Sequence, residues 1–239
     1  MDYKELDLRG FSNERQWDVT TAFPALMRKV YLWMTLALAI TGMTAYGVAT
    51  SPGILATIYG SSAIMWGIVI AQLALVLTVS AAINRLSLSV ATLLFVLYSV
   101  LNGVMFSSIF LVYTASSIST VFFITAGTFG AMSLVGYTTK TDLSSIGKYL
   151  FMALIGLVIA TIVNIFVGSS SLEMILSYLG VLIFVGLTAW DTQKIKQMLV
   201  EAPDAGESSQ KIALLGALSL YLDFINLFIY LLRIFGRRD

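Results

Sequence analysis

Two aspartates lie inside segments of the chain that are otherwise apolar. Asp191 lies in VGLTAWDTQKIK, and Asp223 lies in LYLDFINLFIYLLR. Placing an aspartate at the centre of a membrane helix costs about 2.5 to 3.5 kcal/mol even on a lenient insertion scale. One explanation is that each acid hydrogen-bonds a neighbouring helix, but Asn, Ser or Thr would do this at lower cost. The alternative is that the two acids have a functional role.

Two neighbouring acids in a membrane can share a proton. Mutual repulsion and removal from water both favour the neutral form, so the pair can exchange a proton near neutral pH without any histidine. Asp191 and Asp223 therefore predict a pH-sensing pair.

The composition identifies an integral membrane protein. Of the 239 residues, 58% are hydrophobic and only 11% are charged, and the mean hydropathy is +0.90, which is too apolar for a soluble globule. The absence of cysteine and histidine excludes disulfides, thiolate metal sites and the commonest general base. We therefore predict no enzymatic activity and no cofactor. A net charge of +1 without a basic domain gives no reason to propose a nucleic-acid partner.

Seven segments are long and apolar enough to cross a bilayer as helices, which requires about 20 residues each. Polar or Gly/Pro/Ser breaks separate them. They cover roughly residues 29–50, 61–83, 86–113, 117–137, 148–167, 172–192 and 212–232. The organisation predicted is a polar N-terminal tail over residues 1–27, a seven-helix transmembrane domain over residues 28–235 and a basic tail over residues 236–239. We expect the lipid bilayer to surround the seven-helix domain.

The distribution of basic residues predicts a cytosolic N-terminus. The N-terminal tail, with the first residues of the first span, has five Lys and Arg residues, and the second, fourth and sixth loops have one, two and three. The first, third and fifth loops have none. Basic residues concentrate on the cytoplasmic side, so this alternation supports both the seven spans and their orientation. The C-terminal Arg233, Arg237 and Arg238 disagree with it. Either the rule fails at the last helix, or the seventh segment is broken and does not fully cross.

The sixth and seventh segments are antiparallel and joined on the cytosolic side. If the sixth helix continues to about Met198, Asp191 lies roughly 10 Å from its end at 1.5 Å per residue. Asp223 lies roughly 18 Å from Lys211 by the same rise. We therefore expect the two carboxyl groups at overlapping depths in the cytosolic half of the bundle.

The two aspartate motifs and the GYTTKTDLS loop resemble the Bax inhibitor-1 family, in particular its bacterial inner-membrane members. The likeness extends over nearly the whole chain after the N-terminal tail. It implies an all-α bundle in which six helices surround a central C-terminal helix. It also implies a pH-sensitive calcium leak gated by a hydrogen-bonded aspartate pair, which falls here on Asp191 and Asp223. In such a leak the two acids, when both are ionised, would form with nearby water a hard oxygen site on the ion pathway. A divalent cation such as calcium would contact this site only transiently, because conduction requires weak binding.

The chain departs from the family pattern at two supporting positions. Some members carry an acid in the second helix, where this chain offers Gln72 as the comparable buried polar residue. The family arginine that latches the aspartate pair has Arg85 as its nearest candidate. We add Asn226 as a third supporting residue, because it lies three positions after Asp223 on the same helix face.

Two other kinds of function remain open. Acids on two adjacent helices also suit an intramembrane aspartyl protease. Those enzymes resemble one another in a G-x-G-D motif, whereas Leu220, Tyr221 and Leu222 precede Asp223. The chain could instead be a non-transporting modulator that binds other membrane proteins, such as quality-control proteases, as described for some family members. The polar N-terminal tail would offer a handle for such partners.

Small residues recur at four-residue spacing in the fourth span. Ala126, Gly127, Gly130 and Ala131 lie in the segment TAGTFGAMS. Such spacing lets helix backbones approach closely. We therefore predict a tight helix contact on this part of the fourth span.

Overall fold

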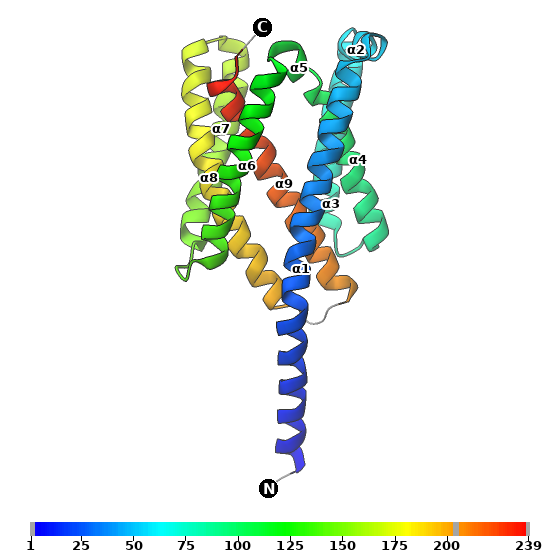
Figure 1. The fold of residues 1–239 in the computed structure, drawn as a ribbon, viewed down its shortest axis with the longest axis vertical. Helices are drawn as coiled ribbons and strands as arrows, with labels where there is room; N and C mark the ends of the chain where they lie inside the picture. The colour runs from blue at the N-terminus through cyan, green and yellow to red at the C-terminus, as the bar shows by residue number, and fades with distance from the viewer. Residues whose placement is uncertain (1–2, 203–205, 238–239) are drawn as a thin grey trace.

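The structure is a computed structural model, and it describes residues 3–202 and 206–237, with side chains from residue 23 onward. Figure 1 shows a bundle of long helices with the two termini at opposite ends. No β-strand occurs in the described residues. The helices are α1 (Tyr3–Ala49), α2 (Pro52–Tyr59), α3 (Ser62–Ala82), α4 (Leu88–Phe106), α5 (Ile109–Val112), α6 (Ala115–Thr138), α7 (Ser144–Val167), α8 (Ser170–Val200) and α9 (Glu207–Phe235).

The predicted all-α membrane fold is confirmed. Seven stretches within the described part are long and apolar enough to cross a membrane. They are Phe23–Ala49, Ser62–Ala82, Leu88–Val112, Ala115–Thr138, Ser144–Val167, Ser170–Val200 and Glu207–Phe235. Each lies on one of the segments predicted from the sequence. Helix α1 begins at Tyr3, so the polar N-terminal tail is helical, and Figure 1 shows this part of α1 extending beyond the other helices.

The third predicted span is interrupted near one end. Helix α4 ends at Phe106, and the short α5 starts at Ile109. At the break, the hydroxyl of Ser107 donates to the carbonyl of Val104 at 2.7 Å, and that of Ser108 donates to Met105 at 3.0 Å. Serine side chains that bond nearby carbonyls compete with the regular helix, which explains the interruption.

The link between α8 and α9 is shorter than the gap between the sixth and seventh predicted segments, which end at residue 192 and begin at residue 212. Helix α8 continues to Val200, as expected from the extension of the sixth span towards Met198. Helix α9 already begins at Glu207. The carboxylate of Glu207 lies 3.0 Å from Lys211 Nζ, and it accepts a hydrogen bond from the backbone N–H of Leu88 at 3.0 Å. The bond to Leu88 ties the start of α9 to the start of α4.

Helix α9 is the most buried of the membrane-length helices in the described chain. In its most apolar stretch 67% of the residues are buried, compared with 44% in α8 and 6% in both α3 and α7. It packs against α1, α4, α6 and α8, whereas α3 packs mainly against α4, and α7 mainly against α8. The arrangement of six helices around a central seventh is therefore not confirmed: α9 is enclosed by four helices, with α3 and α7 outside them.

A buried hydrogen-bond chain joins α9 to two other helices. The hydroxyl of Thr41 on α1 donates to the carbonyl of Ser99 on α4 at 2.9 Å, and it lies 2.7 Å from the Tyr221 hydroxyl of α9. Because Thr41 gives its single proton to Ser99, Tyr221 is the donor to Thr41. The Tyr221 ring also meets Phe95 and Tyr98 edge-on. This chain of hydrogen bonds holds α9 in place two residues before Asp223.

Candidate functional site

Asp223 lies in the buried middle of α9. Its side chain is only 4% exposed, and its Oδ2 atom accepts no hydrogen bond from the described residues. Tyr221 and Phe224, its near neighbours on the helix, are also buried. A buried polar atom without a partner costs free energy, and it is rare in native proteins. Asp223 therefore occupies a position that packing alone does not explain.

Asp191 lies on α8, the neighbouring helix, and is partly buried. Helices α8 and α9 pack against each other extensively, and the two carboxyl groups are close enough to interact electrostatically. Asp191 also interacts with Lys194, whose ammonium group lies 5.1 Å from the centre of the Trp190 ring. The structure thus places Asp191 and Asp223 within electrostatic range of each other across the α8–α9 interface.

The hydroxyl groups near Asp191 are turned towards the backbone. Thr188 donates to the carbonyl of Phe184 at 2.7 Å. Thr192 donates to the carbonyl of Thr188 at 2.8 Å and lies 3.4 Å from the Ser133 hydroxyl on α6. These side chains satisfy their own hydrogen-bonding needs within α8 and towards α6. Their protons are therefore already donated to partners other than Asp191.

Gln193 connects α8 to the loop between α6 and α7. Its Nε2 atom donates to the carbonyl of Thr141 at 2.8 Å, and its Oε1 atom accepts from the backbone N–H of Leu143 at 2.8 Å. The side chain is only 7% exposed. Gln193 is a positioning residue that the sequence reasoning missed, because its partners are backbone groups about fifty positions away.

Two glycines permit close helix contact next to Asp191. A Cβ atom at Gly136 on α6 would collide with the backbone of Ala189, and one at Gly147 on α7 would collide with the Trp190 ring. Ala189 and Trp190 directly precede Asp191, so α6 and α7 hold this part of α8 from two sides. The predicted tight contact at Gly127 and Gly130 is wrong: both positions face open space.

The three supporting residues do not join the pair. Asn226 donates to the carbonyl of Leu222 in its own helix at 2.8 Å, as amides in helices often do. Gln72 lies on α3, which has no extensive contact with α9 in the described chain, and its Nε2 atom is buried without an acceptor among the described residues.

Arg85 does not latch the aspartates in this structure. It is exposed in the turn between α3 and α4, and no ion pair joins it to either acid in the described part of the chain. Asp223 lies sixteen positions into α9, which places it about 24 Å from the start of that helix at 1.5 Å per residue. A side chain in a turn at the membrane surface is therefore poorly placed to reach it.

The acidic residues of the described chain form no group of three or more that could hold a metal ion together. A cation at Asp191 and Asp223 would depend on two carboxylates, water and backbone oxygens. Resident calcium sites use six to eight oxygen ligands.

A family model and several known proteins match this chain over most of its length. A family model described as "Inhibitor of apoptosis-promoting Bax1" matches residues 24–239. The chain is 53% identical over 214 residues to "Inner membrane protein YbhL" of Escherichia coli strain K12, covering 89% of this chain and 91% of that protein. It is 47% identical to a protein of Borreliella burgdorferi, covering 89% and 91%, and 42% identical to one of Deinococcus radiodurans, covering 89% and 90%.

Proposed function

Because this chain belongs to the Bax inhibitor-1 family, we propose that it is a pH-sensitive leak for calcium or a related cation. In this proposal the gate is the aspartate pair, Asp191 on α8 and Asp223 on α9. The observation that carries the proposal is the buried carboxyl group of Asp223, which lacks a hydrogen-bond partner at Oδ2 and interacts electrostatically with Asp191.

The mechanism follows from the cost of charge in a buried site. With one proton shared, the pair carries a single negative charge, and α8 and α9 can stay packed against each other. When both acids are ionised, like charges repel across a site of low dielectric, and the two helices separate. Water then enters, and the carboxylates offer oxygen ligands that a divalent cation uses briefly as it passes.

The proposed setting is the bacterial inner membrane, with the N-terminus in the cytoplasm. The name of the Escherichia coli relative states an inner-membrane protein, and seven membrane-length helices suit a multi-pass protein. The alternation of Lys and Arg among the loops supports the orientation. Protons and calcium ions would reach the aspartates from the cytosolic half of the bundle.

Reconstitution in liposomes tests the leak. Calcium entry is followed with a trapped fluorescent dye over a range of pH, for the native protein and for Asp191→Asn and Asp223→Asn. We expect calcium flux through the native protein to rise with pH, because deprotonation opens the gate. Each variant has lost one ionisable group, so its flux at alkaline pH is expected to fall towards the level that the native protein shows at acid pH.

Glu201→Gln is the matched control, because Glu201 is an exposed acid at the end of α8. Its flux and pH profile are expected to equal those of the native protein. A pH profile that both aspartate variants leave unchanged would end the proposal, and so would native flux equal to that of protein-free liposomes.

A second candidate is a modulator that binds other membrane proteins, such as quality-control proteases. It is favoured by the N-terminal part of α1, which extends beyond the bundle (Figure 1). Deleting residues 1–22 separates the two candidates. If the protein is a modulator, the deletion variant should no longer co-purify with other membrane proteins, while any calcium flux persists. If the protein is only a leak, the variant should keep its calcium flux, and the native protein should show no specific partner.

A further inference from the structure

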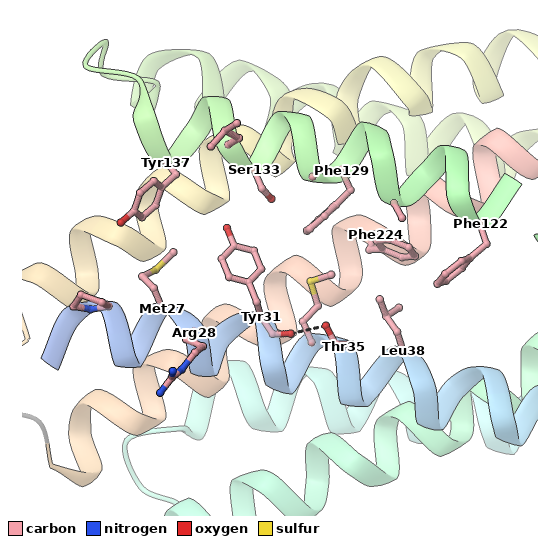
Figure 2. A pocket seen from close by; sticks show the side chains of 15 residues that line it. Met27, Arg28, Tyr31, Thr35, Leu38, Phe122, Phe129, Ser133, Tyr137 and Phe224 are labelled. Atoms are coloured by element: carbon pink, nitrogen blue, oxygen red, sulfur yellow. Dashed lines mark hydrogen bonds between the residues drawn. The ribbon is translucent and has the colours of Figure 1, made fainter. Parts of the chain in front are cut away.

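A cavity of about 660 Å³ lies between α1 and α6, with α9 behind it. In the described chain α1 and α6 make no extensive contact with each other, although both pack against α9. Figure 2 shows side chains from α1 and from α6 projecting into this space. The volume is within the range of sites that hold small molecules. We call this space the α1–α6 groove.

The groove is mainly apolar along its length. Phe122, Phe129 and Phe224 gather at one end, and Leu38 lies opposite them on α1 (Figure 2). The Thr35 hydroxyl donates to the carbonyl of Tyr31 in its own helix at 2.8 Å, so it needs no hydrogen-bond acceptor in the groove. Phe122 is 40% exposed, so the groove is open on the side that faces the lipid. A hydrocarbon chain suits this surface.

The other end of the groove carries positive charge. Arg28 lines it, together with Tyr31 and Tyr137. Lys196 of α8 donates to the carbonyl of Tyr137 at 2.8 Å, and its ammonium group lies 5.0 Å from the centre of the Tyr137 ring. In the described residues the groove is lined by no acid that would offset these charges. Basic pockets between membrane helices bind anionic lipid head groups.

The distance between the two ends of the groove matches the thickness of the hydrocarbon layer of one leaflet. Arg28 and Leu38 are ten residues apart on one helix, which corresponds to about 15 Å at 1.5 Å per residue. The hydrocarbon core of a bilayer is about 30 Å thick, so one leaflet contributes about 15 Å. Arg28 lies five residues after Phe23, where the first membrane-length stretch begins. The cation is thus placed at the depth of the head groups.

We propose that the α1–α6 groove binds one anionic glycerophospholipid from the leaflet on the Arg28 side. The phosphate lies at Arg28, close to the end where Lys196 sits, and one acyl chain runs along α1 towards Phe122. Neither Asp191 nor Asp223 lines the groove. Lipid binding can therefore be measured without calcium flux, and its outcome is independent of the proposed leak.

Native mass spectrometry of the purified protein tests this site with phosphatidylglycerol and phosphatidylcholine as probes. Gly130→Leu fills the groove, because Gly130 lines it and a Cβ atom there meets nothing within 4 Å. Gly127→Leu is the control on the same helix: its Cβ is equally unobstructed, but Gly127 does not line the groove. Arg28→Gln removes the charge, and Lys29→Gln is its control at the adjacent exposed position.

We expect the native protein to retain phosphatidylglycerol in preference to phosphatidylcholine. Arg28→Gln should weaken phosphatidylglycerol retention about fivefold, the effect of one basic residue at an anionic lipid surface. Gly130→Leu should lose the bound lipid, whereas Gly127→Leu and Lys29→Gln should keep it. Circular dichroism and size exclusion verify that each variant is folded, and Ala126→Leu, which also fills the groove, replaces Gly130→Leu if that variant is not.

Three results would overturn the proposal. The first is equal retention of the two lipids by the native protein. The second is an Arg28→Gln or groove-filling variant that behaves like its control. The third is a native protein that has the mass of a dimer and a Gly130→Leu variant that has the mass of a monomer. In that case a second copy of the chain would occupy the groove.

Discussion

At the scale of single residues, Gln193 holds the loop between α6 and α7 against α8 through two hydrogen bonds to backbone groups. Gln193→Ala removes both bonds. A hydrogen bond contributes about 0.5 to 1.5 kcal/mol, and a buried group left without a partner costs about 1 to 3 kcal/mol. We therefore expect the free energy of unfolding in detergent to fall by about 1 to 3 kcal/mol, as measured by denaturant titration.

Gln197→Ala provides the comparison for that measurement. Gln197 lies one helical turn further along α8 and is exposed, so its replacement should change the free energy of unfolding by less than about 0.5 kcal/mol. Equal losses for the two variants would show that the hydrogen bonds of Gln193 contribute nothing particular to stability.

Asp142 in the same loop gives a pH dependence outside the membrane. Hydrogen bonds from the side chain and the backbone N–H of Ser144, the latter 2.8 Å long, lower the pKa of Asp142 below its usual value of 3.8. Since the folded-state pKa is lowered, the stabilisation is present above the unfolded value and is lost as pH falls through the folded value. Carboxyl-carbon NMR titration should give a pKa below 3.8, and a value at or above it would contradict this assignment.

At the scale of helices, the contact between α6 and α8 depends on Gly136. A Cβ atom there would meet the backbone of Ala189, which cannot move without displacing α8. Overpacking of this kind costs about 1 to 3 kcal/mol, so Gly136→Ala should lower the free energy of unfolding by that amount. The measurement is thermal unfolding in detergent, followed by circular dichroism.

Gly130→Ala on the same helix is the control, because it measures the general effect of replacing a helical glycine without disturbing the contact between α6 and α8. Gly130 has open space around it, and alanine is the better helix former. This variant should therefore be neutral or slightly more stable. If Gly136→Ala were as well tolerated as Gly130→Ala, the close approach of α6 and α8 would not matter for stability.

These glycines also show which features a sequence can predict and which it cannot. The seven spans and the isolated acids Asp191 and Asp223 were predictable, because length, hydropathy and the rarity of charge in apolar segments are properties of the chain itself. Small-residue spacing identifies candidate faces but not the face that meets a neighbour, so Gly127 and Gly130 were chosen instead of Gly136. The break at Ser107 and the partners of Gln193 depend on three-dimensional neighbours, which one sequence does not contain.

At the scale of the whole molecule, the unbroken α9 excludes one of the two explanations for the C-terminal arginines, a break in the seventh helix. Its 29 residues correspond to about 44 Å at 1.5 Å per residue, longer than the hydrocarbon core of about 30 Å. The alternative of a broken seventh helix is therefore wrong. Beyond α9, the backbone of Arg237 donates to the Ser117 hydroxyl at 2.9 Å and accepts from the N–H of Thr114 at 3.2 Å.

The end of the described chain is thus bound to the start of α6, which follows the third loop. That loop carries no Lys or Arg, so the distribution of basic residues predicts that it lies on the side opposite the N-terminus. We therefore predict that the two termini lie on opposite sides of the membrane. The chain has no cysteine, so single substitutions such as Ser12→Cys and Asp239→Cys can be labelled directly with a membrane-impermeant maleimide. In intact cells the reagent should reach position 239 and should not reach position 12.

Two loop positions calibrate this labelling. Lys140→Cys lies in the fourth loop, predicted to be cytosolic, and Ser171→Cys lies near the start of α8 on the opposite side; both positions are exposed. Position 12 should label together with 140 only after the membrane is permeabilised, and position 239 should label together with 171 before it. Labelling of positions 12 and 239 under the same condition would mean that the number of complete crossings is even. The attachment of the C-terminal residues to the start of α6 would then have to form on the N-terminal side, which a full-length α9 does not allow.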